Sequence, residues 1–217
     1  MGKQGDRSSA PRDLGREEVT AALGRVRAAL VQRGLLLLQD AELPAATTLI
    51  VGEVVRGSWW GHPQNKLVYD TLQQLGPDVL WVKLVRGKET IVARSLWPAL
   101  LSTARSRAAW QLQGLSAAGQ QLLELVDTAP ASVRLDQVTL PAAKVPLREV
   151  AREVERRLLV HADELHTESG RHVKVLQSWV DWQREHGVNE QPAAAEARAT
   201  LEAAVQDWPK PGLPWQV

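Results

Sequence analysis

The sequence predicts a mainly helical protein with short β-hairpins. Apolar residues recur at helical spacing in several stretches that are separated by Gly or Pro. Two runs rich in branched residues, VLWVKLV and ETIVARS, are joined by the basic turn Arg86-Gly87-Lys88, which is typical of a hairpin. A content of 44% hydrophobic and 24% charged residues is ordinary for a globular protein.

Three helices are expected before this hairpin. Residues 1–14 are polar with Gly, Ser and Pro, so we expect them to form a disordered tail. A helix is expected from Arg16, because the following residues place Val and Leu on one face and Glu in the first turn. A second is expected over 44–55, opened by proline. The third lies within GHPQNKLVYDTLQQL and ends at Gly76-Pro77.

Most of the chain after the hairpin is also expected to be helical. Helices are predicted over 97–110 and 116–127, and a strongly amphipathic one, LREVAREVERRLLV, begins at Leu147. The segment HADELHTESGRH is expected to be extended with a turn at Ser169-Gly170, and VKVLQSWVDWQREHG to be helical. A last helix follows Pro192.

The expected order of elements is three helices, a strand, a basic turn and a second strand. This is the order of a winged helix, in which one helix enters a DNA groove. Residues 15–113 therefore resemble the winged-helix superfamily, with a basic wing. A similar order recurs around 147–173, which leaves open a second, tandem unit over 114–187. Residues 188–217 would add a C-terminal helix and a tail that carries Pro and Trp.

Composition narrows the location and the partners. No segment approaches the roughly 20 apolar residues that a membrane span needs, and the polar start is unlike a signal peptide. Cysteine is absent, which excludes disulfides and thiolate metal sites. We therefore expect a cytoplasmic protein with no membrane partner and no cofactor. Most of the nine Trp residues are expected to anchor the core, and stacking on bases is the minority interpretation.

The positive charge is concentrated in one region. Residues 53–110 carry eight basic and four acidic residues, whereas residues 111–170 carry six basic and nine acidic ones. Basic and amide side chains at the start of the third helix and on the hairpin suit phosphates and base edges. The candidate DNA-binding residues are Gln64, Asn65, Lys66, Lys83, Arg86, Lys88 and Arg94. The alternative is an ordinary solvated hairpin.

The hairpin tip provides a direct expectation. Arg86 and Lys88 flank Gly87 at the turn, where a wing can lie along a phosphate backbone. Replacing both cations with Glu is therefore expected to weaken binding to all duplexes while changing stability little.

A group of histidines and carboxylates is a candidate metal site. Its members are His161, Asp163, Glu164, His166, Glu168 and His172. The two first histidines are five residues apart, a spacing that aligns ligands neither on a strand nor on a helix. A polar hairpin is therefore favoured, and no metal site is expected.

Gln111-Leu112-Gln113 directly follows Trp110. This stretch resembles the catalytic Gln-apolar-Gln motif of tandem winged-helix DNA glycosylases of the YcaQ (AlkZ) type, and the resemblance would imply base excision. Gly114-Leu115 follows where that family carries an acidic residue, and a polar helix end is the alternative interpretation. Phosphate loops and nucleophile elbows are absent from the sequence.

These patterns favour a non-catalytic protein that binds double-stranded DNA, in regulation or in DNA maintenance. A protein-interaction module of winged-helix type is the second hypothesis, because the second half of the chain is acidic. A glycosylase-like repair enzyme is the third. Fold alone does not decide among them.

Overall fold

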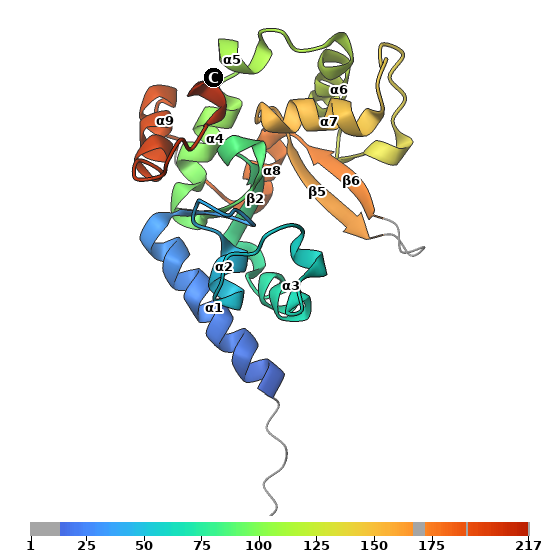
Figure 1. Ribbon diagram of the computed structural model, residues 1–217. Coiled ribbons are helices and arrows are strands. Elements are labelled where there is room, and N and C mark those ends of the chain that lie inside the picture. Colours follow the sequence, from blue (N-terminus) through green and yellow to red (C-terminus); the bar gives the residue numbers. More distant parts are fainter. Residues whose placement is uncertain (1–13, 167–171, 190, 217) are drawn as a thin grey trace, which may run out of the picture.

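The computed structural model describes residues 14–166, 172–189 and 191–216, which form nine α-helices and six β-strands (Figure 1). The helices are α1 (Leu14–Arg33), α2 (Ala46–Val51), α3 (Asn65–Gln73), α4 (Trp97–Arg105), α5 (Ala109–Leu112), α6 (Ala117–Thr128), α7 (Leu147–Arg156), α8 (Trp179–His186) and α9 (Ala194–Ala203). The strands are β1 (Leu35–Leu37), β2 (Val79–Lys83), β3 (Glu89–Ala93), β4 (Val133–Arg134), β5 (His161–His166) and β6 (His172–Gln177). The mainly helical class with short hairpins is confirmed. No helix in these described ranges is long and apolar enough to cross a membrane.

The first unit comprises α1, β1, α2, α3, β2 and β3, and its antiparallel sheet has the order β1-β3-β2. Leu36 lies opposite Ile91, and both pack into a cluster with α1, α2 and α3. Leu35 and Leu37 belong to a different cluster on the other face. The sheet is therefore buried on both sides, which explains the continuous apolar run at β1. This strand was not among the elements expected from the sequence.

The second unit repeats the order of the first. After α6 and β4 come a short 3₁₀ turn (Leu135–Gln137), α7, β5 and β6, and the sheet has the order β4-β6-β5. Ser116 caps α6, since its Oγ accepts a hydrogen bond from the backbone N–H of Gly119 at 2.9 Å. The hypothesis that the shape of the first half recurs agrees with this order.

A large central core joins the two units. It includes Trp97 of α4, Leu158 after α7, Trp179 and Trp182 of α8, and Leu201 of α9. The C-terminal segment also contributes to this core, and Figure 1 shows it returning beside α4. Because the same cluster draws on both units and on the C-terminal helix, we expect the chain to unfold cooperatively.

Three expected helices differ from the observed ones. The helix expected over 44–55 is only α2, which ends at Gly52 with a φ of 85°. The helix expected over 97–110 divides into α4 and α5, with Arg107 between them at a φ of 49°. The segment after residue 172 is not helical as expected, because it pairs on both sides as the central strand β6. Helix α8 begins only after Ser178, whose side chain caps it.

Candidate nucleic-acid interface

The candidate residues at the start of α3 lie on the surface of the first unit. Gln64 precedes the helix, and the side-chain amide of Asn65 donates to the backbone carbonyl of Trp60 at 2.8 Å. Lys66 is exposed, but it forms an ion pair with Asp70 one turn along the helix. The charge of this helix surface is therefore balanced within α3 itself.

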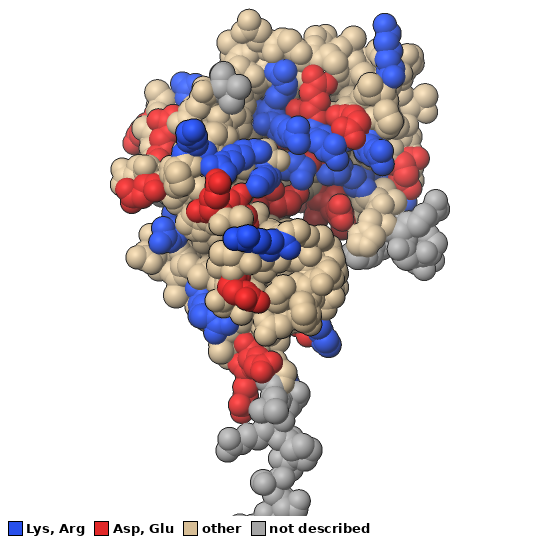
Figure 2. Space-filling model, viewed as in Figure 1, with Lys and Arg blue, Asp and Glu red and all other residues tan. Residues whose placement is uncertain are grey.

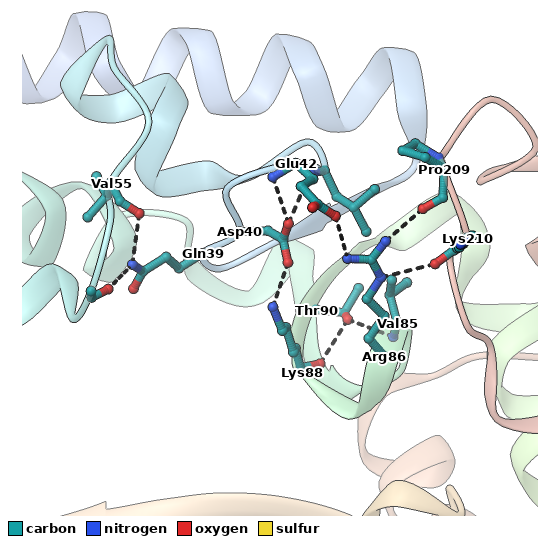
Figure 3. A network of polar contacts seen from close by, with 12 residues as sticks. Gln39, Asp40, Glu42, Val55, Val85, Arg86, Lys88, Thr90, Pro209 and Lys210 are labelled. Atoms are coloured by element: carbon teal, nitrogen blue, oxygen red, sulfur yellow. Dashed lines mark hydrogen bonds and ion pairs between the residues drawn. The ribbon is translucent and has the colours of Figure 1, made fainter.

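The basic hairpin tip is turned inward onto the protein. Arg86 donates to the backbone carbonyls of Pro209 and Lys210 at 2.7 and 3.0 Å, and it pairs with Glu42 at 3.2 Å (Figure 3). Lys88 pairs with Asp40 at 2.6 Å. A loop before α2 and the C-terminal segment therefore occupy the charged groups of the turn.

The buried Asp40 is held as a carboxylate. Burial acts to raise its pKa, but the hydrogen bond from Lys88 and those from the backbone N–H groups of Glu42 and Leu43 outweigh burial, and its pKa is lowered to about 2. This ion pair is thus a fixed part of the fold around the hairpin.

The remaining hairpin candidates are also engaged. Lys83 pairs with Glu89 on the adjacent strand. The guanidinium of Arg94 lies 5.0 Å from the ring centre of Trp97, in a cation–π arrangement. The structure thus pairs Lys83 with a carboxylate of the first unit and places Arg94 against an aromatic ring of α4.

A different basic surface lies on α7 of the second unit. Its arginine stripe consists of Arg148, Arg152 and Arg156, which are spaced four residues apart and are all exposed. Figure 2 shows Lys and Arg side chains gathered in a band over the position of α7. Residues four apart lie along one side of a helix, so the three guanidinium groups form a row.

Two of the three acidic residues of α7 have partners away from the arginine stripe. Glu155 is buried and pairs with Lys174 at 2.6 Å. Glu153 accepts hydrogen bonds from the backbone N–H and the hydroxyl of Ser116 at 2.9 and 2.6 Å. Glu149 remains beside the stripe and pairs with Arg152 at 2.7 Å. The zero net charge of the helix therefore conceals a surface on which cations predominate.

The stripe continues into a cleft of about 740 Å³, here called the basic cleft. Arg86, Trp110, Gln113, Arg156 and Arg157 are among the residues that line it. The cleft thus joins the hairpin turn of the first unit to the end of α7 in the second.

Two arginines of the basic cleft have no carboxylate partner among the described residues. Arg157 donates to the backbone carbonyls of Gln111 and Gln113 at 3.0 and 2.9 Å, which orients its guanidinium without a carboxylate. Arg156 makes no hydrogen bond or ion pair within the described residues, and its side chain lies against Gly87. The cleft therefore offers two cations to an anionic ligand.

Gln111 has a structural role that the sequence did not indicate. It is fully buried, and its amide nitrogen donates to the backbone carbonyls of Ala104 and Arg157 at 2.8 and 3.1 Å. Its oxygen accepts from the backbone N–H of Ala108 and the hydroxyl of Ser106 at 2.9 and 3.0 Å. Gln113, in contrast, is exposed at the basic cleft. The motif therefore does not present both side chains to one surface.

The histidine group is divided between core and surface. His161 packs beside Trp179 and Trp182, and burial lowers its pKa to about 4. His172 lies 3.2 Å from Glu164 on the exposed hairpin. Glu168 and the expected turn at residues 169–170 lie outside the described residues. No group of three metal-ligating side chains occurs in the ranges that the structure describes.

The arginine stripe is the feature that sequence reasoning missed. Its signal was the spacing of three arginines at four-residue intervals, which the acidic net charge of residues 111–170 obscured.

No family model, curated protein or solved structure matches this chain.

Proposed function

We propose that this protein binds double-stranded DNA without catalysis, through two tandem winged-helix units. The order of helices and strands in each unit, with the first strand beside the last one in the sheet, supports the winged-helix assignment. In such a unit the helix before the hairpin enters the groove. That helix is α3 in the first unit and α7 in the second.

The observation that carries the proposal is the arginine stripe on α7. Its helix has the position of a recognition helix, and three exposed guanidinium groups follow one side of it. Successive residues of the stripe are about 6 Å apart along the helix axis, from the rise of 1.5 Å per residue. Phosphates follow each other at a similar spacing along a DNA strand, so each arginine can contact the backbone.

The basic cleft supports the same proposal. Arg156 and Arg157 extend the positive surface from α7 toward the hairpin turn of the first unit. We therefore propose that the DNA backbone crosses from α7 over this cleft, and that α7 supplies more of the affinity than the hairpin tip.

A triple variant, Arg148→Gln, Arg152→Gln and Arg156→Gln, tests the proposal by fluorescence anisotropy with a labelled 20-base-pair duplex. We expect affinity to fall about 10- to 100-fold, since hydrogen bonds to charged groups contribute about 1.5–3 kcal/mol in favourable geometry and less when exposed. The salt slope should become shallower by about 2 to 3 units, through lost counterion release.

The matched control removes three cations elsewhere. Arg16, Arg33 and Arg198 lie on α1 and α9 and have no ion pair among the described residues. Their replacement with Gln should leave the affinity within about threefold of the parent protein. Equal losses in the two triple variants would mean that only net charge matters, and a parent protein that binds no duplex at low salt would refute the proposal.

A protein-interaction module remains the second candidate function, and one observation favours it. The groove between the two units carries exposed aromatic and acidic side chains, and its two lysines, Lys83 and Lys174, are paired with carboxylates. Such a surface is unsuited to phosphate and suits a protein partner.

A further inference from the structure

A groove lies between the first unit and the hairpin of the second, and its lining residues differ from those of the basic cleft. It encloses about 650 Å³ and continues into an adjoining volume of about 410 Å³. Both volumes are lined by Trp60, Trp81 and Glu164. We call it the aromatic groove.

The aromatic side of the groove is rigid and open. Trp60 stacks on Trp59, with ring centres 4.0 Å apart and planes inclined by 25°. Trp59 is 8% exposed, whereas Trp60 is 59% exposed, so the inner ring fixes the outer one. Tyr69 of α3 lies 6.0 Å from Trp60 and is 42% exposed. Two large aromatic rings on a fixed support therefore remain available to a ligand.

The opposite side of the groove is acidic. Asp163 and Glu164 of β5 line it, and Glu164 is 61% exposed. The lysines at the groove are Lys83 and Lys174, and each already has a carboxylate partner. His172 also lines the groove, 3.2 Å from Glu164, and the arginine of the partner would share this carboxylate with it. Figure 2 shows acidic side chains in the hollow below the basic band. A phosphate would be repelled here, and a cation would be attracted.

Two edge strands border the same groove. β2 is at the edge of the first sheet and β5 is at the edge of the second, and residues of both line the groove. Within the described residues neither strand pairs with another strand on its outer side. An open strand edge offers backbone donors and acceptors to an extended peptide.

We propose that the aromatic groove binds an extended segment of a partner protein that carries arginine. The guanidinium group stacks on the face of Trp60 beside Tyr69, and Glu164 pairs with its N–H groups. Arginine fits this site better than lysine, because its planar group stacks on aromatic rings and donates two parallel hydrogen bonds. The inference concerns a second surface and does not depend on DNA binding.

The experiment titrates the full chain with a blocked heptapeptide of alternating Gly and Arg, by isothermal titration calorimetry. The same peptide with citrulline in place of arginine keeps nearly the same planar shape, but a carbonyl oxygen replaces one nitrogen, which removes the charge and two N–H donors. We expect the arginine peptide to bind at least about tenfold more tightly, because both the cation–π contact and the ion pair need the charge.

Two variants locate the site. Trp60→Leu and Glu164→Gln should each weaken binding of the arginine peptide about three- to tenfold, since each removes one of the two attractions. Both side chains are exposed, so the fold should persist, which circular dichroism verifies. Glu196→Gln on α9 is the matched control and should bind like the parent protein.

The outcomes distinguish this inference from others. Equal binding of the arginine and citrulline peptides, or no binding at all, would overturn it. Binding of oligothymidylate that is lost in Trp60→Leu would instead identify a base-stacking groove. The triple arginine variant of α7 should still bind the peptide. Peptide binding can therefore be confirmed even if the protein does not bind DNA.

Discussion

The two units share an order of elements but use their charges in opposite ways. In the first unit Lys66 pairs with Asp70 on α3, and the hairpin cations pair with residues from the loop before α2 and the C-terminal segment. In the second, the arginines of α7 face outward, and two of its three acidic residues are used inside the fold. The comparison teaches that helices at the same position in two similarly ordered units can differ in exposed charge, which is balanced on α3 and mainly positive on α7.

The largest effect should come from reversing the charge of the first hairpin tip. Replacing Arg86 and Lys88 with Glu leaves Asp40 and Glu42 without their cationic partners and adds two like charges beside them. Breaking a buried ion pair typically costs about 3–5 kcal/mol, and we expect roughly 3 kcal/mol here because Lys88 is half exposed. Urea denaturation measures this change.

This result would revise the expectation from the sequence that the tip can be reversed at little cost. The control replaces Arg16 and Arg33 with Glu, which should change the unfolding free energy by less than about 0.5 kcal/mol. If both double variants were equally stable, the contacts of Arg86 with the C-terminal segment would have no energetic role.

A second prediction concerns the joint between the units. Gln111→Ala should destabilise the protein by about 2–3 kcal/mol, because it leaves the buried carbonyls of Ala104 and Arg157 without their donor. Gln113→Ala is the matched control, since its side chain is exposed at the basic cleft. Thermal unfolding of the two variants measures the difference. A selective loss of base excision with unchanged stability would favour the glycosylase hypothesis instead.

Acid should weaken the first unit through Asp40. Its pKa is about 2 in the folded protein and lies below the unfolded value of about 3.9, so its stabilisation is complete above about pH 5. This stabilisation is lost as the pH falls through the folded pKa, and it amounts to about 2 kcal/mol. The difference in unfolding free energy between the parent and Asp40→Asn should therefore narrow from pH 5 to pH 2. A difference that stayed constant would show that another group controls it.

The smallest effect should be that of Lys66→Gln on DNA affinity. Its ion pair with Asp70 is exposed, so we expect a stability change below about 0.5 kcal/mol and an affinity within about twofold of the parent. Arg156→Gln, which removes one unpaired cation, should weaken binding about three- to tenfold. If Lys66→Gln weakened binding more than Arg156→Gln, the first unit would be the main DNA surface.

The sequence determined the local features of this protein. The helices were located by helical spacing, by the break at Gly76-Pro77 and by Ser116. The hairpin was located by the branched runs around Arg86-Gly87-Lys88. Each of these signals depends on residues within a few positions of one another, so the local sequence pattern is enough to predict the element. The strand β6 was not predicted, because its conformation is determined by pairing with β4 and β5 on either side.

Only the tertiary structure decided which charges are available. Arg86 meets the carbonyl of Lys210 across 124 positions of sequence, and Lys88 meets Asp40 across 48. Gln111 is likewise buried because α5 packs against the end of α7, where its side-chain amide donates a hydrogen bond to the backbone. A net charge counted along the chain cannot distinguish a cation that is paired at a distance from one that faces solvent. The side chains of α7 show the reverse case, where burial and capping remove acidic groups and leave the arginine stripe exposed.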